Sequence, residues 1–371
     1  MGFFGNLFGG GSSLGPLQIR IIEKEFDNKS CFVLQCMGLI PVYTRKDISI
    51  VTSIVCKDKD GKQAPVLSFF EDEQEILTSS FQHIHEIGEV DGPGGYNDWG
   101  GIAVIIPEMI QPAYGGQQTL GVVARIVDND DMPSIILGYC DRSDVIWTDS
   151  VNLKYDFESK GYKEEQADKD EARALSVKLG VAVALVDDDF DDTEGETIKK
   201  WIKKIIAPYS GDRKEELKEI YNSAFKESYN LEKSGNLNLD DICNKMNKIA
   251  DKAQKLEALE LVNKVMAADS RILESETKLI NHICELLHID PIDAEKIRDK
   301  QLVKLKPTSG NIDVESLLGL DPTWSNSKIL GQLGKEFVKW NGRMNSLQEG
   351  EEKDNAQRML DLIGETRKKY V

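Results

Sequence analysis

Short apolar segments that are rich in β-branched residues recur along residues 16–160, and polar, glycine-containing turns separate them. This pattern predicts β-strands, and the glycine-rich turns between the segments are typical of an antiparallel β-sandwich. No arrangement of a nucleophile and a base is recognisable in this region, so we interpret the sandwich as a recognition domain. The predicted strands begin at Leu17, Ser30, Ile48, Ile102, Leu120, Ile135 and Val151.

The pattern changes at Gly161. From there onward Glu, Lys, Asp, Ala and Leu dominate, and the apolar positions recur with the period of an α-helix. This predicts an all-helical domain over residues 162–300, in which Asn238 is the N-cap of one helix. A linker that contains Pro and Gly at 307–310 precedes a last helical unit over residues 312–371.

A pattern of acidic residues and threonine occurs twice, 80 residues apart, within the predicted helical domain. Each copy follows one apolar helical segment and precedes another, which indicates a duplicated helix–turn–helix unit in a helical bundle. We take the carboxylates that share their offsets in the two copies as the candidate site residues. They are Asp189, Glu194 and Glu196 in the first copy and Asp269, Glu274 and Glu276 in the second.

These carboxylates have two interpretations. Carboxylates in the first turn of a helix cap its free N–H groups and complement its dipole, so both copies could simply be helix starts. However, residues 187–196 hold seven carboxylates, whose mutual repulsion favours a counterion or a basic partner. Oxygen ligands without His or Cys point to Ca²⁺ or Mg²⁺ rather than Zn²⁺. The spacing does not match an EF-hand, so a metal site here would be assembled from both segments.

The two units resemble the TerB-like family of tellurite-resistance proteins, chiefly through Met266-Ala-Ala-Asp269 and the glutamates that follow. The resemblance implies an all-helical bundle with two acidic clusters that engage divalent cations or partner proteins. The chain differs from the family's pattern after each aspartate, where Phe190 and Ser270 replace a glycine. Carried over by position, the resemblance assigns to the clusters Asp189, Glu196, Asp269 and Glu276, with Glu194 and Glu274 beside them.

The last helical unit consists of two amphipathic segments, 329–340 and 355–370, which predict an antiparallel hairpin with Ser325 as the N-cap of its first helix. After its Leu-Gly-Leu start the hairpin resembles a J-domain, whose His-Pro-Asp loop stimulates an Hsp70-type ATPase. The predicted turn, residues 340–343, reads Trp-Asn-Gly-Arg and lacks that signal. We therefore expect either a degenerate J-like hairpin that serves as a docking face or a plain hairpin packed on the bundle.

The composition narrows the classes of partner. The formal net charge is −18, which argues against a strong direct nucleic-acid binder because phosphate binding requires a surplus of Lys and Arg. Basic proteins or divalent cations are favoured instead. The six cysteines form no CxxC pair, and no secretory signal or membrane-spanning run is visible, so we expect reduced thiols in the cytoplasm.

Three further features have open interpretations. The residues 1–15, rich in Gly and Phe, form either a flexible tail or a plug that associates weakly with the inner membrane or with a partner. His83 and His85 fit either a metal site or a partly exposed strand or loop. Tyr96 and Trp99, beside glycines, indicate either a binding loop or, more commonly, a Trp that anchors the sandwich core.

Together these patterns predict a multidomain protein with a β-sandwich, a TerB-like bundle and a J-like hairpin. The resemblance implies a non-enzymatic adaptor or sensor subunit of a bacterial stress-response or anti-phage defence complex. Its partners would be other protein subunits, among them an ATPase or a helicase. The acidic clusters would bind a partner or a Ca²⁺ or Mg²⁺ ion, and we expect no other cofactor. The alternative is an Hsp70-type co-chaperone that acts through the J-like C-terminus.

Overall fold

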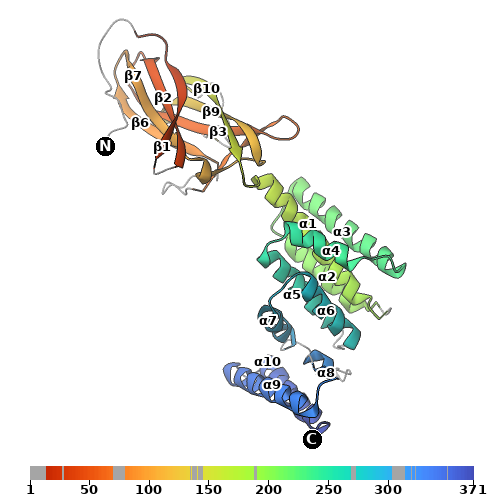
Figure 1. Cartoon of the computed structure of the whole chain (residues 1–371). Coiled ribbons are helices and arrows are strands. Elements are labelled where there is room, and N and C mark those ends of the chain that lie inside the picture. The colour runs from red at the N-terminus through yellow and green to blue at the C-terminus, as the bar shows by residue number, and fades with distance from the viewer. Residues whose placement is uncertain are drawn as a thin grey trace. The chain divides into compact units, whose positions relative to one another are not determined.

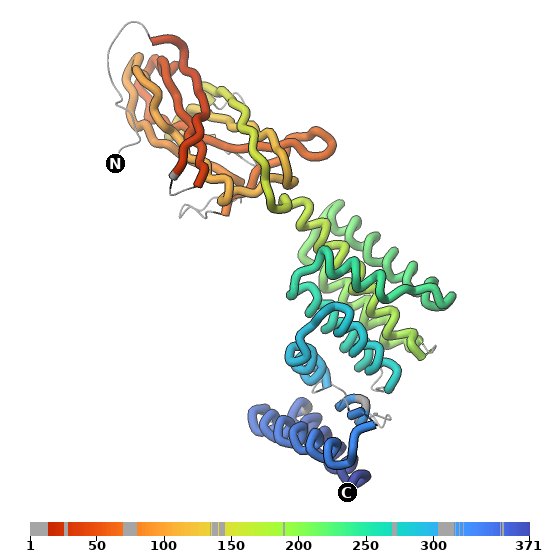
Figure 2. The backbone as a smooth tube through the Cα atoms, in the orientation of Figure 1, coloured from red at the N-terminus to blue at the C-terminus, as the bar shows by residue number. Residues whose placement is uncertain are grey.

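The structure is a computed structural model whose contacts divide the chain into two compact units, Met1–Gln166 and Ala167–Val371. The first unit is built mainly from strands and the second from helices, as Figures 1 and 2 show. The predicted change from strands to helices is therefore confirmed. The described residues are 14–26, 29–69, 80–133, 135, 140, 145–187, 190–268, 273–302, 314–318, 320, 321, 323–348 and 350–371.

The strands of the first unit are β1 (Gln18–Phe26), β2 (Lys29–Ile40), β3 (Lys46–Lys57), β4 (Gln63–Pro65), β5 (Leu67–Ser68), β6 (Gln82–Val90), β7 (Gly94–Ile105), β8 (Ile110–Gln111), β9 (Gly116–Asp128) and β10 (Trp147–Phe157). One sheet has the order β1–β2–β7, and a second has the order β10–β9–β3–β4, with β6 also paired to β3. The short strands β5 and β8 pair with each other. All of these pairings are antiparallel.

The two larger sheets pack their apolar faces against each other. Leu34 of β2 and Ile102 of β7 are fully buried in one sheet, and Ile50 of β3 and Leu120 of β9 are fully buried in the other. All four belong to one continuous core cluster. Because buried residues of both sheets meet in this one cluster, the predicted antiparallel β-sandwich is confirmed.

The bulge in β2 depends on a glycine. The register of β2 against β7 shifts between Cys36 and Gly38. Gly38 has a φ of 120°, and a Cβ added there would lie 2.4 Å from the carbonyl oxygen of Pro16. Glycine alone avoids both the strained backbone and the steric clash.

Six of the seven predicted strands are present. The segments that begin at Leu17, Ser30 and Ile48 correspond to β1, β2 and β3, and the later ones to β7, β9 and β10. The strand predicted from Ile135 lies outside the described residues, apart from Ile135 itself. The first thirteen residues of the predicted tail also lie outside them.

The helices of the second unit share a single apolar core. Two predicted caps are confirmed, because the Asn238 side chain accepts a hydrogen bond from the Asp241 amide at 3.1 Å, and Ser325 Oγ accepts one from the Lys328 amide at 3.4 Å. No helix among the described residues combines the length and apolar composition needed to cross a bilayer. The helices are α1 (Tyr162–Ala184), whose first turn belongs to the first unit, α2 (Asp192–Ile206), α3 (Gly211–Lys233), α4 (Leu239–Ile249), α5 (Lys252–Met266), α6 (Glu274–Leu286), α7 (Pro291–Leu302), α8 (Val314–Leu317), α9 (Asn326–Ser346) and α10 (Glu351–Lys368).

The last two helices form the predicted hairpin, but the predicted position of its turn is wrong. Residues 340–343 lie inside α9, which continues to Ser346. The helix does not stop earlier because Trp340 is fully buried and extends the apolar side that begins with Ile329 and Leu333. The connection to α10 runs instead through residues 347–350, which read Leu-Gln-Glu-Gly. A helical hairpin is thus confirmed, whereas its likeness to a J-domain is not.

Candidate functional site

The starts of α2 and α6 are built in the same way. Glu194 Oε2 accepts a hydrogen bond from the Asp191 amide at 3.1 Å, and Glu276 Oε2 accepts one from the Leu273 amide at 2.9 Å. Each glutamate is the third residue of its helix and is only 5% exposed. In this arrangement a buried carboxylate satisfies a backbone N–H just before the helix, and we call the two features the carboxylate-locked helix starts.

The glutamates that play the same role in the two helix starts are not the ones that the sequence repeat aligns. The repeat aligns Glu194 with Glu274 and Glu196 with Glu276, but the equivalent hydrogen bonds are made by Glu194 and Glu276. The other two glutamates are exposed: the Glu196 side chain is 49% exposed and pairs with Lys199, and Glu274 is 55% exposed and pairs with Lys278. The hydrogen bond and charge of Lys199 lower the pKa of Glu196.

The ends of α1 and α5, which precede the two acidic turns, lie at the same end of the bundle formed by α1 to α6 (Figure 1). Helices α1 and α5 run in the same direction in Figure 1. Helix α1 packs against both α2 and α5 near Gly180, where a Cβ would make ordinary van der Waals contact, 3.5 Å, with side-chain atoms of Ile198 and Leu261. Helix α1 ends at Ala184 and α5 at Met266, shortly before the two turns.

The remaining two candidate residues, Asp189 and Asp269, lie outside the described residues. Within the described part of the chain, no three His, Cys, Asp or Glu side chains converge in a way that could hold a metal ion. The prediction of a Ca²⁺ or Mg²⁺ site therefore stays a prediction. The observed role of Glu194 and Glu276 is to cap helices, and Glu196 and Glu274 remain exposed beside the turns.

Replacing Glu276 with alanine should lower the free energy of unfolding of the helical unit by about 1–2 kcal/mol, because the Leu273 amide loses its buried acceptor. The matched change, Glu274→Ala, removes only an exposed ion pair on the same turn and should cost far less. Urea denaturation followed by helical circular dichroism compares the two variants. Equal losses would show that the buried hydrogen bond is not what distinguishes them.

A charge network built around the buried acids Asp299 and Glu336 joins α7 to α9. Lys339 Nζ lies 2.5 Å from Glu295 Oε1 and 3.2 Å from Asp299 Oδ2, and it also pairs with Glu336. Arg343 Nη2 lies 3.0 Å from Asp299 Oδ2, whose side chain is only 2% exposed. Burial opposes the charge on Lys339, but the hydrogen bonds to Glu295 and Glu336 and the charge of Asp299 outweigh it and raise the pKa of the amine. The network thus holds the first helix of the hairpin against the bundle.

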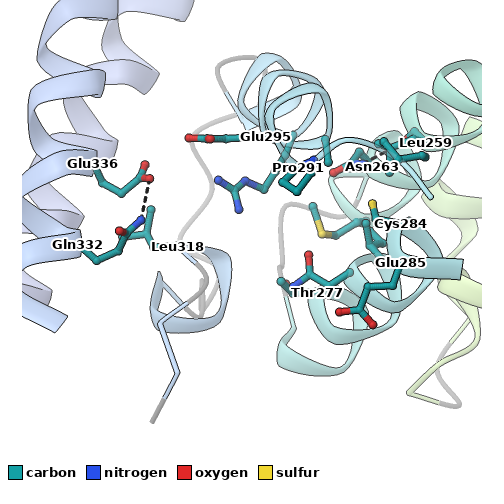
Figure 3. Close-up of a pocket in the computed structure, with 16 residues that line it drawn as sticks. Leu259, Asn263, Thr277, Cys284, Glu285, Pro291, Glu295, Leu318, Gln332 and Glu336 are labelled. Carbon is teal, nitrogen blue, oxygen red and sulfur yellow. Dashed lines mark hydrogen bonds between the residues drawn. The ribbon is translucent and has the colours of Figure 1, made fainter. Parts of the chain in front are cut away.

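A pocket of about 450 Å³ lies beside this network (Figure 3). Its walls come from α5, α6, α7 and α9, together with Leu318. Gln332 donates a hydrogen bond to Glu336 at 3.5 Å on the α9 side. Cys284 lines the opposite side, where burial raises the pKa of its thiol to about 11, so the thiol is protonated at neutral pH. Nothing in the sequence alone pointed to this pocket.

The structure also places the open candidates of the first unit. His85 Nε2 lies 3.2 Å from Tyr96 Oη, and burial lowers the pKa of this histidine. Tyr96 is only 3% exposed and belongs to the core. The Trp99 ring instead makes a cation–π contact with the Arg20 guanidinium, which lies 4.0 Å from the ring centroid. The prediction of Trp99 as the core anchor is wrong, because on β7 this position does not point into the sandwich. Tyr96 is the aromatic residue that fills the core.

Comparison with known proteins identifies one part of the chain. The family model described as Tellurite resistance protein TerB matches residues 173–299. No curated protein and no solved structure matches the chain. The matched segment extends from α1 to α7 and includes both carboxylate-locked helix starts, while α9 and α10 lie beyond it. The second unit therefore contains a TerB domain, similar to the tellurite resistance protein TerB.

Proposed function

We propose that this chain is a non-enzymatic adaptor or sensor subunit of a bacterial stress-response or anti-phage defence assembly. Its TerB domain would bind a divalent cation, or a basic surface of a partner protein, through the two acidic turns. The β-sandwich would recognise a second component, and the partners would include an ATPase or a helicase. The six cysteines are joined by no disulfide, which fits the reducing cytoplasm in which we expect the protein to act.

The observation that carries this proposal is the common construction of the two helix starts. Glu194 and Glu276 are buried and accept hydrogen bonds from the backbone, so the starts of α2 and α6 are each anchored to the residue that precedes the helix. Because the ends of α1 and α5 lie at the same end of the bundle (Figure 1), we infer that the carboxylates of the two turns act together. A formal net charge of −18 adds to the attraction of a cation or a basic protein.

An Hsp70-type co-chaperone is the less favoured reading of the C-terminal hairpin. The connection between α9 and α10 reads Leu-Gln-Glu-Gly and has no His-Pro-Asp. Helix α9 is also tied to α7 by the charge network. We therefore propose that the hairpin extends the TerB bundle, and stimulation of an Hsp70 ATPase by the full chain would contradict this.

Calorimetric titration of the full chain with Ca²⁺ and with Mg²⁺ tests the cation site. We expect saturable binding that Asp189→Asn and Asp269→Asn each weaken about tenfold or more, because each change removes one carboxylate ligand. Glu227→Gln, an exposed acid on α3 that pairs with Lys178, is the control and should leave binding unchanged. Binding that neither aspartate variant alters would defeat the proposed site.

A further inference from the structure

Apart from Glu336 Oε2, which pairs with Lys339, two buried polar groups in the wall of the pocket in Figure 3 have no hydrogen-bond partner. Asn263 on α5 is 1% exposed; its Nδ2 donates to the Leu259 carbonyl at 2.9 Å, but its Oδ1 accepts nothing. Arg298 on α7 reaches Asp299 through Nη2 at 3.4 Å, while its buried Nε–H has no acceptor. An unsatisfied buried group costs about 1–3 kcal/mol, so such groups in one pocket indicate a place for a ligand.

The two groups specify complementary chemistry. Asn263 Oδ1 is an acceptor and needs a donor, and Arg298 Nε–H is a donor and needs an acceptor. A carboxamide offers both, because its N–H can donate to Asn263 while its carbonyl oxygen accepts from Arg298. The rest of the wall is largely apolar, including Met266, Ile280 and Leu318, which suits the flat face of a ring.

The charges around the pocket argue against other ligand classes. The wall acids Glu285, Glu295 and Glu336, counted together with Arg298 in the wall and with Lys339, which pairs with two of them, leave a net charge of −1 that disfavours a carboxylate or phosphate. A simple ammonium ion has donors only and would leave the Arg298 Nε–H unsatisfied and a like charge beside it. The volume of about 450 Å³ lies within the usual range for a small-molecule site.

We propose that this pocket binds a small neutral molecule that bears a carboxamide or an amide-like heterocyclic edge. The walls come both from the TerB helices α5, α6 and α7 and from α9 of the hairpin, through Gln332 and Glu336. An occupant would therefore stabilise the docking of the hairpin on the TerB domain. This inference goes beyond the proposed function and does not depend on the acidic turns.

Three ring compounds of nearly equal shape provide the test. Nicotinamide is neutral, nicotinic acid is an anion, and 3-(aminomethyl)pyridine is a cation at neutral pH. Titration of the methyl-labelled full chain, followed by NMR, should show that nicotinamide shifts the methyl signals of Met266 and Ile280. The anion and the cation should bind about tenfold more weakly or not at all.

Variants decide whether the binding uses this pocket. Asn263→Leu removes the acceptor while keeping the branch at Cγ, and Ala294→Leu fills the space from α7; each should abolish the shifts. Asn247→Leu is the matched control, because Asn247 also has an unpartnered Oδ1 but lies outside the pocket. Nicotinamide binding that survives both pocket variants, equal binding of the three compounds, or no binding of nicotinamide would each overturn the proposal.

Discussion

Replacing Asp299 with alanine should lower the free energy of unfolding of the helical unit by about 3–5 kcal/mol. This carboxylate is almost completely buried and pairs with Arg298, Lys339 and Arg343. Without it, three cationic side chains remain together and only two acids, Glu295 and Glu336, remain to balance them. Most of this loss of stability arises because the cationic side chains are left without a buried counter-charge. The net stabilisation that the intact ion pairs provide is much smaller.

The control for this change lies on the same helix. Asp293 pairs with Lys252 at 2.7 Å, and the lysine side chain is 74% exposed. Asp293→Ala should therefore have only a small effect, since exposed ion pairs are screened by water and salt. Urea denaturation monitored by helical circular dichroism measures both variants. Similar values for the two would mean that the Asp299 network is solvated in solution.

Replacing Tyr96 with alanine should destabilise the β-sandwich by about 3–5 kcal/mol, the usual cost of removing a buried aromatic ring. The ring belongs to the core between the sheets, and its hydroxyl contacts His85. Tyr96→Phe keeps the ring and should cost only about 1 kcal/mol for the lost hydrogen bond. Hydrogen exchange of the β2 and β7 amides follows the stability of this unit specifically.

Trp99 provides the comparison within the same strand. Its ring is partly exposed and stacks on the Arg20 guanidinium, so Trp99→Ala should cost roughly 1 kcal/mol. Comparing the stability losses of Tyr96→Ala and Trp99→Ala distinguishes a core position from a surface position three residues away. A larger loss for Trp99→Ala would place the tryptophan in the core, as the sequence had suggested.

The sequence predicted the two structural classes because each has its own apolar pattern. Strands such as β3 are short segments rich in β-branched residues, and helices such as α2 repeat their apolar positions at three and four residues. The caps at Asn238 and Ser325 were predictable for the same local reason, since a side-chain acceptor just before a helix bonds to its first N–H groups.

The register of the acidic repeat could not be predicted from matching letters alone. Identical residues favoured the pairs Glu194–Glu274 and Glu196–Glu276, but burial decides which glutamate caps the helix. The signal that the repeat missed is apolar: Ile198 and Ile280 each follow the capping glutamate by one helical turn and are buried. Aligning these two residues would have selected Glu194 and Glu276.

The features of the C-terminal region were hidden for different reasons. Asn341 and Gly342 look like a turn, but Trp340 continues the buried side of α9 and the packing overrides the local preference. The charge network and the pocket depend on which few of many charged residues are buried. In a chain that is 30% charged, the sequence does not distinguish Asp299 from its exposed neighbours.

The most direct test of the account is whether the two acidic turns share one cation site. Mn²⁺, a paramagnetic substitute for Ca²⁺ or Mg²⁺, can be titrated into ¹⁵N-labelled full chain and followed by NMR. The account predicts that the amide signals next to both turns, from Asp191 to Glu194 and from Leu273 to Glu276, broaden together at the same Mn²⁺ concentration. Broadening at one turn only, or scattered over other acidic surfaces such as α3, would contradict it.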